Sequence, residues 1–418
     1  RRQRQMCIRD SVYFVMFTTP AEARGQGGFM GNYAEITIDQ GRIEMTEFGR
    51  HTDLNSGGER PRKLENAPAD WLARYGPFGY QKGPDQIVGG QPWSNITMSP
   101  NFPATAQVVA ELYPQSGGRA VDGVFALDPF ALAGLLSFTG PISVDGVDGV
   151  LTADNIVQFL LVDQYETEND ERLDLLEEVS KETIRLLLAG SLPGPVVVAD
   201  TLGPLVDEGR IVGWAAAPEE QQYFTDVGLT GSMPSVDGRD GVAVVLNNAG
   251  ANKLDVYLER VVSYDATVDP TTGATTATAM VTHTNRAPSS GLPDGVIGNY
   301  TGEAPGTNRI LTSLYSALPV TSASVRTSDG NFTDFVVQSG TEAGWLTGTS
   351  YVAVAPGDSV TLIYELAGTL PLDDGYSLAV RPQPIVVDER LIVSVVDTDG
   401  RALVGFDGPS TQPRVLGD

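Results

Sequence analysis

The pattern of apolar and polar positions divides the chain into two parts. Up to about residue 240, short apolar runs alternate with segments in which apolar residues recur at helical spacing. After Gly241 the helical spacing stops, and short runs rich in Val, Thr, Tyr and Ala alternate with clusters of Gly, Pro, Asp and Asn. This change predicts an α/β (α+β) domain over residues 11–240, followed by an all-β, sandwich-like domain over residues 241–400.

In the first part, apolar or alternating runs predict strands, and apolar residues at helical spacing predict helices. The predicted strands are 12–17, 32–39, 43–48, 121–127 and 211–214. The predicted helices are 102–113, 129–138, 152–161, 169–189 and 218–227. Residues 54–99 are rich in Gly, Pro, Asn and charge, which indicates a long irregular segment of the kind that is often functional or mobile.

In the second part, runs bounded by turn residues predict short strands at the spacing of a β-sandwich. The predicted strands are 242–246, 253–264, 276–284, 322–327, 333–338, 350–354, 359–366, 376–381 and 390–396. Residues 401–418 contain Gly, Pro and Asp and are expected to form a frayed tail.

The first ten residues differ from the rest of the chain. They contain four arginines and lack the apolar core of a signal peptide. We therefore expect residues 1–10 to be a non-native leader, and we expect the natural N-terminus, with any signal or membrane anchor, to be missing.

Composition narrows the classes of partner. The chain has 53 acidic and 27 basic residues, a net charge of −26, which repels the phosphate backbone of nucleic acids, so nucleic acid is not expected as a partner. Its one cysteine, Cys7, excludes an intrachain disulfide and a thiolate metal cluster. Its two histidines, His51 and His283, exclude a His-rich zinc site. No run of about 18 apolar residues is present to cross a membrane.

A glycine-rich loop after the first predicted strand has two interpretations. Gly27 and Gly28 allow backbone N–H groups to approach an anion, and Arg24 and Arg50 flank this hairpin, so together they are candidates to bind a phosphate. The loop lacks the spacing of the established nucleotide-binding motifs, and a tight turn explains the glycines as well. The arginines have the alternative of salt bridges with Glu22 or other nearby carboxylates.

Three further side chains have a structural and a functional interpretation. Asp128 precedes Pro129 and a predicted helix, so N-capping is its default role. Asp53 follows the second hairpin strand, near the strand edge where α/β sheets bind ligands. Arg172 lies early in a predicted helix, where the macrodipole does not favour a positive charge, and this indicates an anionic partner. No catalytic triad or nucleophile-elbow motif is present.

Several motifs resemble the bacterial family called domain of unknown function 4012. In the first part they are AEARGQGGFMG at 21–31, SPNFP at 99–103, DGVFALDP at 122–129, TGP at 139–141 and LTADN at 151–155. In the second part they are ANKLD at 251–255, SSGLP at 289–293 and PGTNR at 305–309. The resemblance implies an extracytoplasmic protein of the cell envelope with an N-terminal membrane anchor.

The first part also resembles, more distantly, the LytR-CpsA-Psr family, through residues 36–53, 122–144 and 172–188. Members of that family transfer polyprenyl-pyrophosphate-linked glycopolymers to the cell wall, with arginines on the pyrophosphate and aspartates assisting Mg²⁺. The resemblance implies that Arg24, Arg50 and Arg172 bind the pyrophosphate with Gly27 and Gly28. It also implies catalytic roles for Arg50, Asp53 and Asp128.

One departure from that family affects the expected metal. Residues 31–33, Gly-Asn-Tyr, stand where the family has an Arg-Ser-Asp-Thr element that supplies a metal-binding aspartate. Two hypotheses therefore stay open. One is a Mg²⁺-assisted enzyme, a phosphotransferase or pyrophosphatase acting on a lipid-linked glycopolymer, and the other is a non-catalytic envelope module that binds a glycan or another protein.

Overall fold

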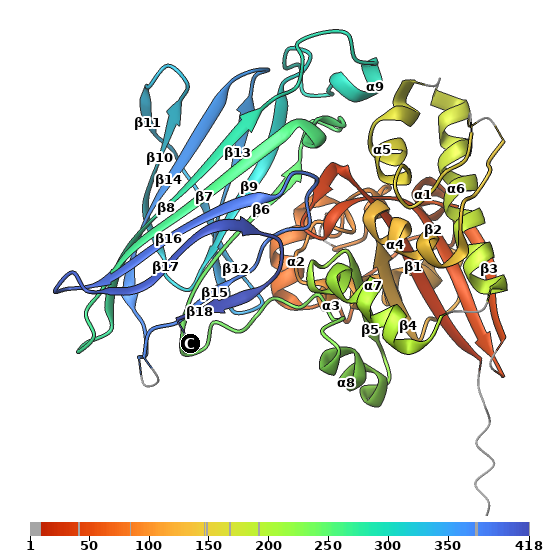
Figure 1. The fold of residues 1–418 in the computed structure, drawn as a ribbon, viewed down its shortest axis with the longest axis horizontal. Coiled ribbons are helices and arrows are strands. Elements are labelled where there is room, and N and C mark those ends of the chain that lie inside the picture. Colours follow the sequence, from red (N-terminus) through yellow and green to blue (C-terminus); the bar gives the residue numbers. More distant parts are fainter. Residues whose placement is uncertain are drawn as a thin grey trace, which may run out of the picture.

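The structure is a computed structural model. It describes residues 10–40, 42–83, 85–145, 147, 149–166, 169–190, 193–372 and 375–417, with the backbone alone at residues 166, 169–176 and 189. The first part of the chain is mixed α/β and the rest consists of β-sheets, as the residue pattern predicted (Figure 1).

A five-stranded sheet in the order β3-β2-β1-β4-β5 organises the first part. Its strands are β1 Ser11–Arg24, β2 Gly27–Asp39, β3 Arg42–Arg50, β4 Gly123–Leu127 and β5 Ile211–Ala215. β1 and β4 are parallel, whereas the other neighbouring strands are antiparallel. The apolar run at 12–17 is buried because β1 is the central strand, with helices over both faces of the sheet.

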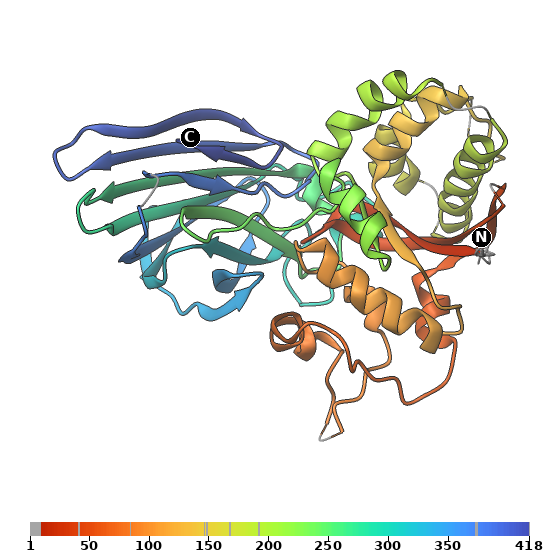
Figure 2. The same ribbon diagram turned by 90° about the horizontal axis from the view of Figure 1, so that it is seen from below.

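Alternate residues of β1 enter two separate cores. Phe14 and Met16 pack with helix α3 Phe102–Gln115 and with aromatic residues of the 54–99 segment. Val15 and Phe17 pack on the opposite face, under a second group of helices. These helices are α4 Pro129–Thr139, α5 Ile156–Leu161, α6 Asn169–Ala189 and α7 Pro195–Asp207. Figure 2 shows α3 on one side of the sheet and these helices on the other.

The irregular segment contains more regular structure than its composition indicates. It includes the end of α1 His51–Ser56, and all of α2 Ala69–Tyr75, η1 Gly76–Phe78 and η2 Pro92–Asn95. Its aromatic residues Trp71, Tyr80 and Trp93 are completely buried. The segment is therefore a packed part of the core. The residue pattern did not predict its short helices, because each is too short for apolar residues to recur at helical spacing. The remaining short elements of the first part are η3 Asp163–Glu166 and α8 Pro218–Asp226.

The second part is a sandwich of two sheets, whose inner faces share one hydrophobic core. The seven-stranded sheet has the order β11-β10-β14-β8-β7-β16-β17, and the six-stranded sheet has the order β12-β13-β9-β6-β15-β18. In chain order the strands are β6 Asp240–Asn248, β7 Leu258–Val268, β8 Ala274–Asn285, β9 Asn308–Ser316, β10 Val320–Thr327, β11 Phe332–Asp334, β12 Gln338–Glu342, β13 Trp345–Val354, β14 Ser359–Thr369, β15 Leu378–Val380, β16 Glu389–Asp397, β17 Ala402–Ser410 and β18 Arg414–Leu416. The short helices η4 Leu254–Tyr257 and α9 Asp294–Ile297 lie in its connections.

The structure corrects several predicted elements. The prediction of a frayed tail at 401–418 is wrong, because β17 pairs with β16 and β18 pairs with β15. Pro409 misled the sequence interpretation, although an edge strand such as β17 tolerates proline. Residues 253–257, predicted as strand, are mostly the 3₁₀ helix η4. Helix α7 was missed because Gly203 and Pro204 interrupt its pattern, and strand β9 because its residues do not alternate.

The tip of the β1–β2 hairpin connects the two parts. Ala23 belongs to the sandwich core and donates its N–H to Asp255 Oδ2 at 2.8 Å. The N–H of Gly25 donates to Asn247 Oδ1 at 3.0 Å, and Gln383 Nε2 donates to the carbonyl of Arg24 at 2.6 Å. The turn that the sequence offered as a phosphate loop is therefore inserted against β6 and η4.

Candidate functional site

Arg24 lies at the end of β1 and is 6% exposed. Its Nη2 forms an ion pair with Glu22 at 2.8 Å, and its Nη1 donates to the carbonyls of Ala23 and Asn248. Lys253 is a second cation on Glu22. These partners occupy the guanidinium that the phosphate interpretation requires, as the salt-bridge alternative predicted.

Gly27 and Gly28 have backbone reasons to be glycine. Gly27 has a φ of +105°, which follows the two-residue turn after Arg24. A Cβ on Gly28 would lie 2.2 Å from the carbonyl carbon of Thr19, so only glycine allows β2 to approach the irregular part of β1. The tight-turn interpretation accounts for both residues.

Arg50 and Asp53 lie together at the start of α1. The N–H of Arg50 donates to Asp53 Oδ2 at 2.8 Å, so Asp53 caps the helix, and Arg50 Nε lies 3.5 Å from Glu177 of α6. Arg24 is thus directed to Glu22 and β6, and Arg50 to Glu177. Arg172 lies in α6, but its side chain is outside the described residues, so its predicted place beside the other two arginines stays a prediction.

Asp128 has the N-capping role that was its default interpretation. Its Oδ1 accepts from the N–H of Ala131 at 2.9 Å, and its Oδ2 accepts from Arg210 Nη1 at 2.9 Å. The side chain is buried, and this burial raises the pKa of Asp128 although Arg210 opposes the shift. Both carboxylate oxygens are engaged within the protein.

The residues expected to assist Mg²⁺ do not form a metal-binding set. Asp53 caps α1 and Asp128 is paired with Arg210. Within the described residues, no three His, Cys, Asp or Glu side chains gather closely enough to hold a metal ion. The expected assistance by Mg²⁺ stays a prediction.

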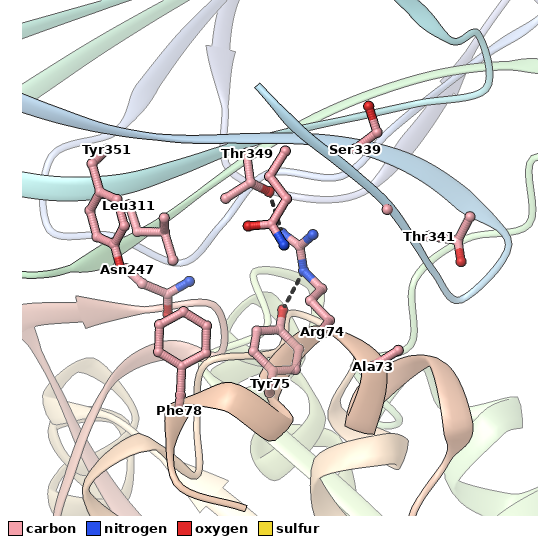
Figure 3. A pocket seen from close by; sticks show the side chains of 12 residues that line it. Ala73, Arg74, Tyr75, Phe78, Asn247, Leu311, Ser339, Thr341, Thr349 and Tyr351 are labelled. Carbon is pink, nitrogen blue, oxygen red and sulfur yellow. Dashed lines mark hydrogen bonds between the residues drawn. The ribbon is translucent and has the colours of Figure 1, made fainter. Parts of the chain in front are cut away.

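A groove at the junction of the two parts is the strongest candidate site. Two adjoining cavities, of about 320 and 340 Å³, share Phe78, Asn247, Leu311 and Tyr351 in their walls. The six-stranded sheet forms one wall of these cavities, and α2 with η1 forms the opposite wall (Figure 3). We call this feature the junction groove.

Aromatic rings and neutral polar groups line the junction groove. Tyr351 is 53% exposed, and Figure 3 shows its ring above Asn247 and on the same side as Phe78. Asn247 accepts from Gly25 through Oδ1, while its Nδ2 donates to no group of the described residues. The hydroxyl-bearing residues Ser339, Thr341 and Thr349 line the other end. The groove therefore presents flat apolar surface beside uncharged hydrogen-bonding groups.

The cations of the junction groove are neutralised by the protein. Arg74 Nε lies 3.1 Å from Glu342 Oε2, and the rest of its guanidinium donates to Ser313, Thr347 and Thr349. Arg309 Nη1 lies 3.8 Å from Glu303, and its guanidinium lies over the ring of Tyr351 at 5.2 Å. Arg24, at the inner end, is paired with Glu22. Every arginine of the groove thus has a carboxylate partner.

Residue patterns did not reveal this groove. Its walls combine α2, β6, β9, β12 and β13, three of which, α2, β9 and β12, were not predicted. An exposed tyrosine among buried strand residues was the one available signal, and a single exposed aromatic residue is common on protein surfaces.

Comparison with known proteins supports the family that the motifs resemble. Residues 10–165 match the family described as Protein of unknown function (DUF4012). No curated protein matches the chain. The resemblance to the LytR-CpsA-Psr family stays a prediction.

Solved structures give only weak matches. A protein from Legionella pneumophila, described as a putative nutrient binding protein, matches at 8% identity and a TM-score of 0.23, over 38% of this chain and 55% of that one. An M1 zinc metallopeptidase from Deinococcus radiodurans, bound to a Tyr-Ser-Ala substrate, matches at 14% identity and a TM-score of 0.21, over 38% of this chain and 42% of that one. The chain thus spans less than two thirds of either protein, and such scores carry no argument about fold or function.

The helices were also compared with the length of a membrane span. None within the described residues is both long and apolar enough to cross a bilayer.

Proposed function

We propose that this chain is a non-catalytic binding module of the bacterial cell envelope, and that the junction groove binds an uncharged segment of a glycan. The placement in the envelope rests on the DUF4012 resemblance. The binding role rests on one observation, which is an exposed tyrosine and a half-buried phenylalanine flanking an asparagine whose amide nitrogen has no partner in the described residues.

The chemistry of the groove matches that of a sugar. A pyranose ring has a face of C–H groups and a rim of hydroxyls. Tyr351 and Phe78 supply flat apolar surface for such a face, while Asn247 Nδ2 supplies a donor for a hydroxyl. Further hydroxyl-bearing residues, Ser339, Thr341 and Thr349, line the other end of the groove.

The charges favour a neutral ligand. The three arginines of the groove are paired with Glu22, Glu303 and Glu342, so they offer an anion little net positive potential. The chain as a whole carries a net charge of −26, which repels polyanions. A pyrophosphate needs arginines that are not already neutralised, because its charge must be compensated on binding.

The prediction for this site concerns Tyr351. In Tyr351→Ala the stacking surface is lost, and we expect binding of the best oligosaccharide to weaken at least tenfold, about 1.4 kcal/mol. The measurement is isothermal titration calorimetry, after a binding screen with oligosaccharides of glucose, mannose, galactose and N-acetylglucosamine. The matched control is Phe332→Ala, which removes another exposed aromatic residue, on β11 of the other sheet, and should leave binding unchanged.

Two results would overturn the proposal. One is that none of these oligosaccharides binds the parent protein, and the other is that Tyr351→Ala binds as tightly as the parent. The enzyme hypothesis has its own assay, in which the protein is incubated with a polyprenyl-pyrophosphate glycan and Mg²⁺. Turnover that is abolished by Arg50→Ala would favour that hypothesis over a purely binding role.

A further inference from the structure

A separate cavity, of about 250 Å³, lies where the end of β15 meets the first part of the chain. Arg381, the residue after β15, lines it. Around it stand the C-terminal end of α7, the loop that follows α8, and the residues before β18 (Figure 1). The lining residues that matter below are Asp207, Gly209, Thr230, Gly231, Ser232 and Gln412.

Arg381 is a buried cation that forms no ion pair with a carboxylate among the described residues. It is 4% exposed, and its only hydrogen bond within the described residues runs from Nη1 to the carbonyl of Pro382 at 2.8 Å. Its Nε is buried and has no partner among the described residues. A Cβ placed on Gly209 would lie 3.6 Å from both Nη1 and Nη2, so glycine leaves space beside the guanidinium.

Other buried arginines of the protein are compensated differently. Arg24, Arg210 and Arg260 form ion pairs with Glu22, Asp128 and Glu389, respectively, at 2.6 to 2.9 Å. Arg62 donates to several backbone carbonyls. Arg381 has neither arrangement. Burial lowers its pKa to about 10, which still leaves the guanidinium charged at neutral pH.

The groups around Arg381 are hydrogen-bond donors of the kind that bind anions. The N–H groups of Thr230, Gly231 and Ser232 have no hydrogen-bond partner among the described residues. The hydroxyl of Ser232 donates to Thr230 Oγ1 at 2.9 Å, and Gln412 also lines the cavity. Gly231 has a φ of +58°, a left-handed conformation that is common where successive N–H groups turn towards an anion.

We propose that this cavity binds a small oxyanion, a phosphate, sulfate or carboxylate group, with Arg381 as its counter-ion and the 230–232 loop as additional donors. A buried charge without a partner is costly, and an anion that accepts from the guanidinium compensates it. This site is separate from the junction groove, so it stands or fails independently of the proposed function.

Asp207 provides a sign test for the proposal. It lines the same cavity, is exposed, and forms no ion pair with Arg381. Its negative charge repels an anion in the cavity. Asp207→Asn should therefore tighten anion binding, a direction opposite to that expected for changes at Arg381.

The experiment is a titration of the whole chain with sodium phosphate, sodium sulfate and sodium acetate at fixed ionic strength. Binding is followed by calorimetry and by the shift in Tm. We expect at least one of these anions to raise the Tm of the parent protein, Arg381→Met to abolish the shift, and Asp207→Asn to enlarge it. A response to acetate alone identifies a carboxylate ligand, whereas a response to phosphate or sulfate identifies a tetrahedral one.

The matched control is Arg401→Met, which removes an exposed arginine from the same part of the chain and so makes the same change in net charge. It should bind the anion as the parent does. If Arg381→Met does not fold, Thr230→Val tests the loop donors with the arginine in place, and weaker binding is expected. The proposal is wrong if none of the three anions binds the parent at fixed ionic strength, or if Arg381→Met and Thr230→Val both bind like the parent.

Discussion

At the scale of single residues, His283 illustrates how the interior of the sandwich controls ionisation. It lies on β8, is completely buried, and its Nε2 is 3.3 Å from Thr312 Oγ1 on β9 of the facing sheet. Burial, together with the nearby positive charge of Arg260, lowers the pKa of His283 to about 3. The imidazole is therefore neutral throughout the range in which an unfolded histidine becomes protonated.

This shift predicts a pH dependence of stability. The unfolded state takes up a proton near pH 6.5 and the folded state only near pH 3. Protonation of His283 therefore favours the unfolded state, and the contribution of His283 to the free energy of unfolding, complete above pH 6.5, decreases as the pH falls towards 3. Between pH 7 and pH 4 this amounts to roughly 3 kcal/mol. The glutamine of His283→Gln cannot be protonated. Between pH 7 and pH 4 the free energy of unfolding of this variant should therefore fall by about 3 kcal/mol less than that of the parent, as measured by urea unfolding at the two pH values.

His51→Gln is the matched comparison. Burial also lowers the pKa of His51, but this side chain is only partly buried, so the same substitution there should give a change of the same sign and smaller size. If the free energy of unfolding of His283→Gln falls as much between pH 7 and pH 4 as that of the parent protein, this explanation is contradicted.

At the scale of elements, the β1–β2 hairpin depends on close backbone packing. Its register shifts between Phe17 and Thr18, where Gly31 is an extra residue on β2, and again between Thr19 and Ala23, where residues 20–22 form a bulge on β1. The bulge brings the backbone of Thr19 against Gly28. This packing positions the hairpin tip against the sandwich, where Gly25 contacts Asn247 of the junction groove.

Two glycines of the same strand provide a paired test. A Cβ on Gly28 meets the backbone of Thr19 at 2.2 Å, whereas a Cβ on Gly31 meets nothing within 4 Å. Gly28→Ala should destabilise the protein by about 3 kcal/mol, because backbone atoms have to move. Gly31→Ala should stay within about 0.5 kcal/mol of the parent. Denaturant unfolding measures both, and equal effects of the two substitutions would show that this contact does not matter.

At the scale of the whole molecule, a buried polar cluster joins the two parts beneath the junction groove. Glu342 of β12 accepts hydrogen bonds from Tyr75 and Ser99 of the first part and from Tyr315 of β9. It also forms the ion pair with Arg74. Burial raises the pKa of Glu342, and Arg74 with these hydrogen bonds opposes the shift. The carboxylate of Glu342 thus forms hydrogen bonds with both parts of the protein.

Removal of this charge should weaken the junction. Glu342→Gln preserves the shape but leaves Arg74 as a buried cation without an ion pair, and we expect a loss of about 3 kcal/mol. Proteolysis of the 227–239 connection between α8 and β6 should become faster. The control is Glu365→Gln on β14, an exposed glutamate bonded to Thr278, which should change stability by less than about 0.5 kcal/mol. Unchanged stability and proteolysis in Glu342→Gln would exclude this role.

Local sequence signals predicted the features whose causes are local. The change from helical to strand pattern near residue 240 follows side-chain periodicity, and the N-cap at Asp128 follows from its place before Pro129. The glycine loop was correctly offered as a tight turn because turn chemistry is encoded within a few residues. Elements that depend on distant neighbours, such as β9 and β17, were missed.

The sequence offered Glu22 as a local partner of Arg24, whereas the long-range partners of the arginines were decided by the tertiary structure. Arg24 contacts Asn248, Arg74 contacts Glu342, and Arg381 faces the loop after α8, all at positions far away in the chain. No local pattern reveals these long-range contacts, because they depend on which strands and loops pack together. Residue order thus specified the two kinds of layer, and the packing between them determined where a neutral groove and an uncompensated cation lie.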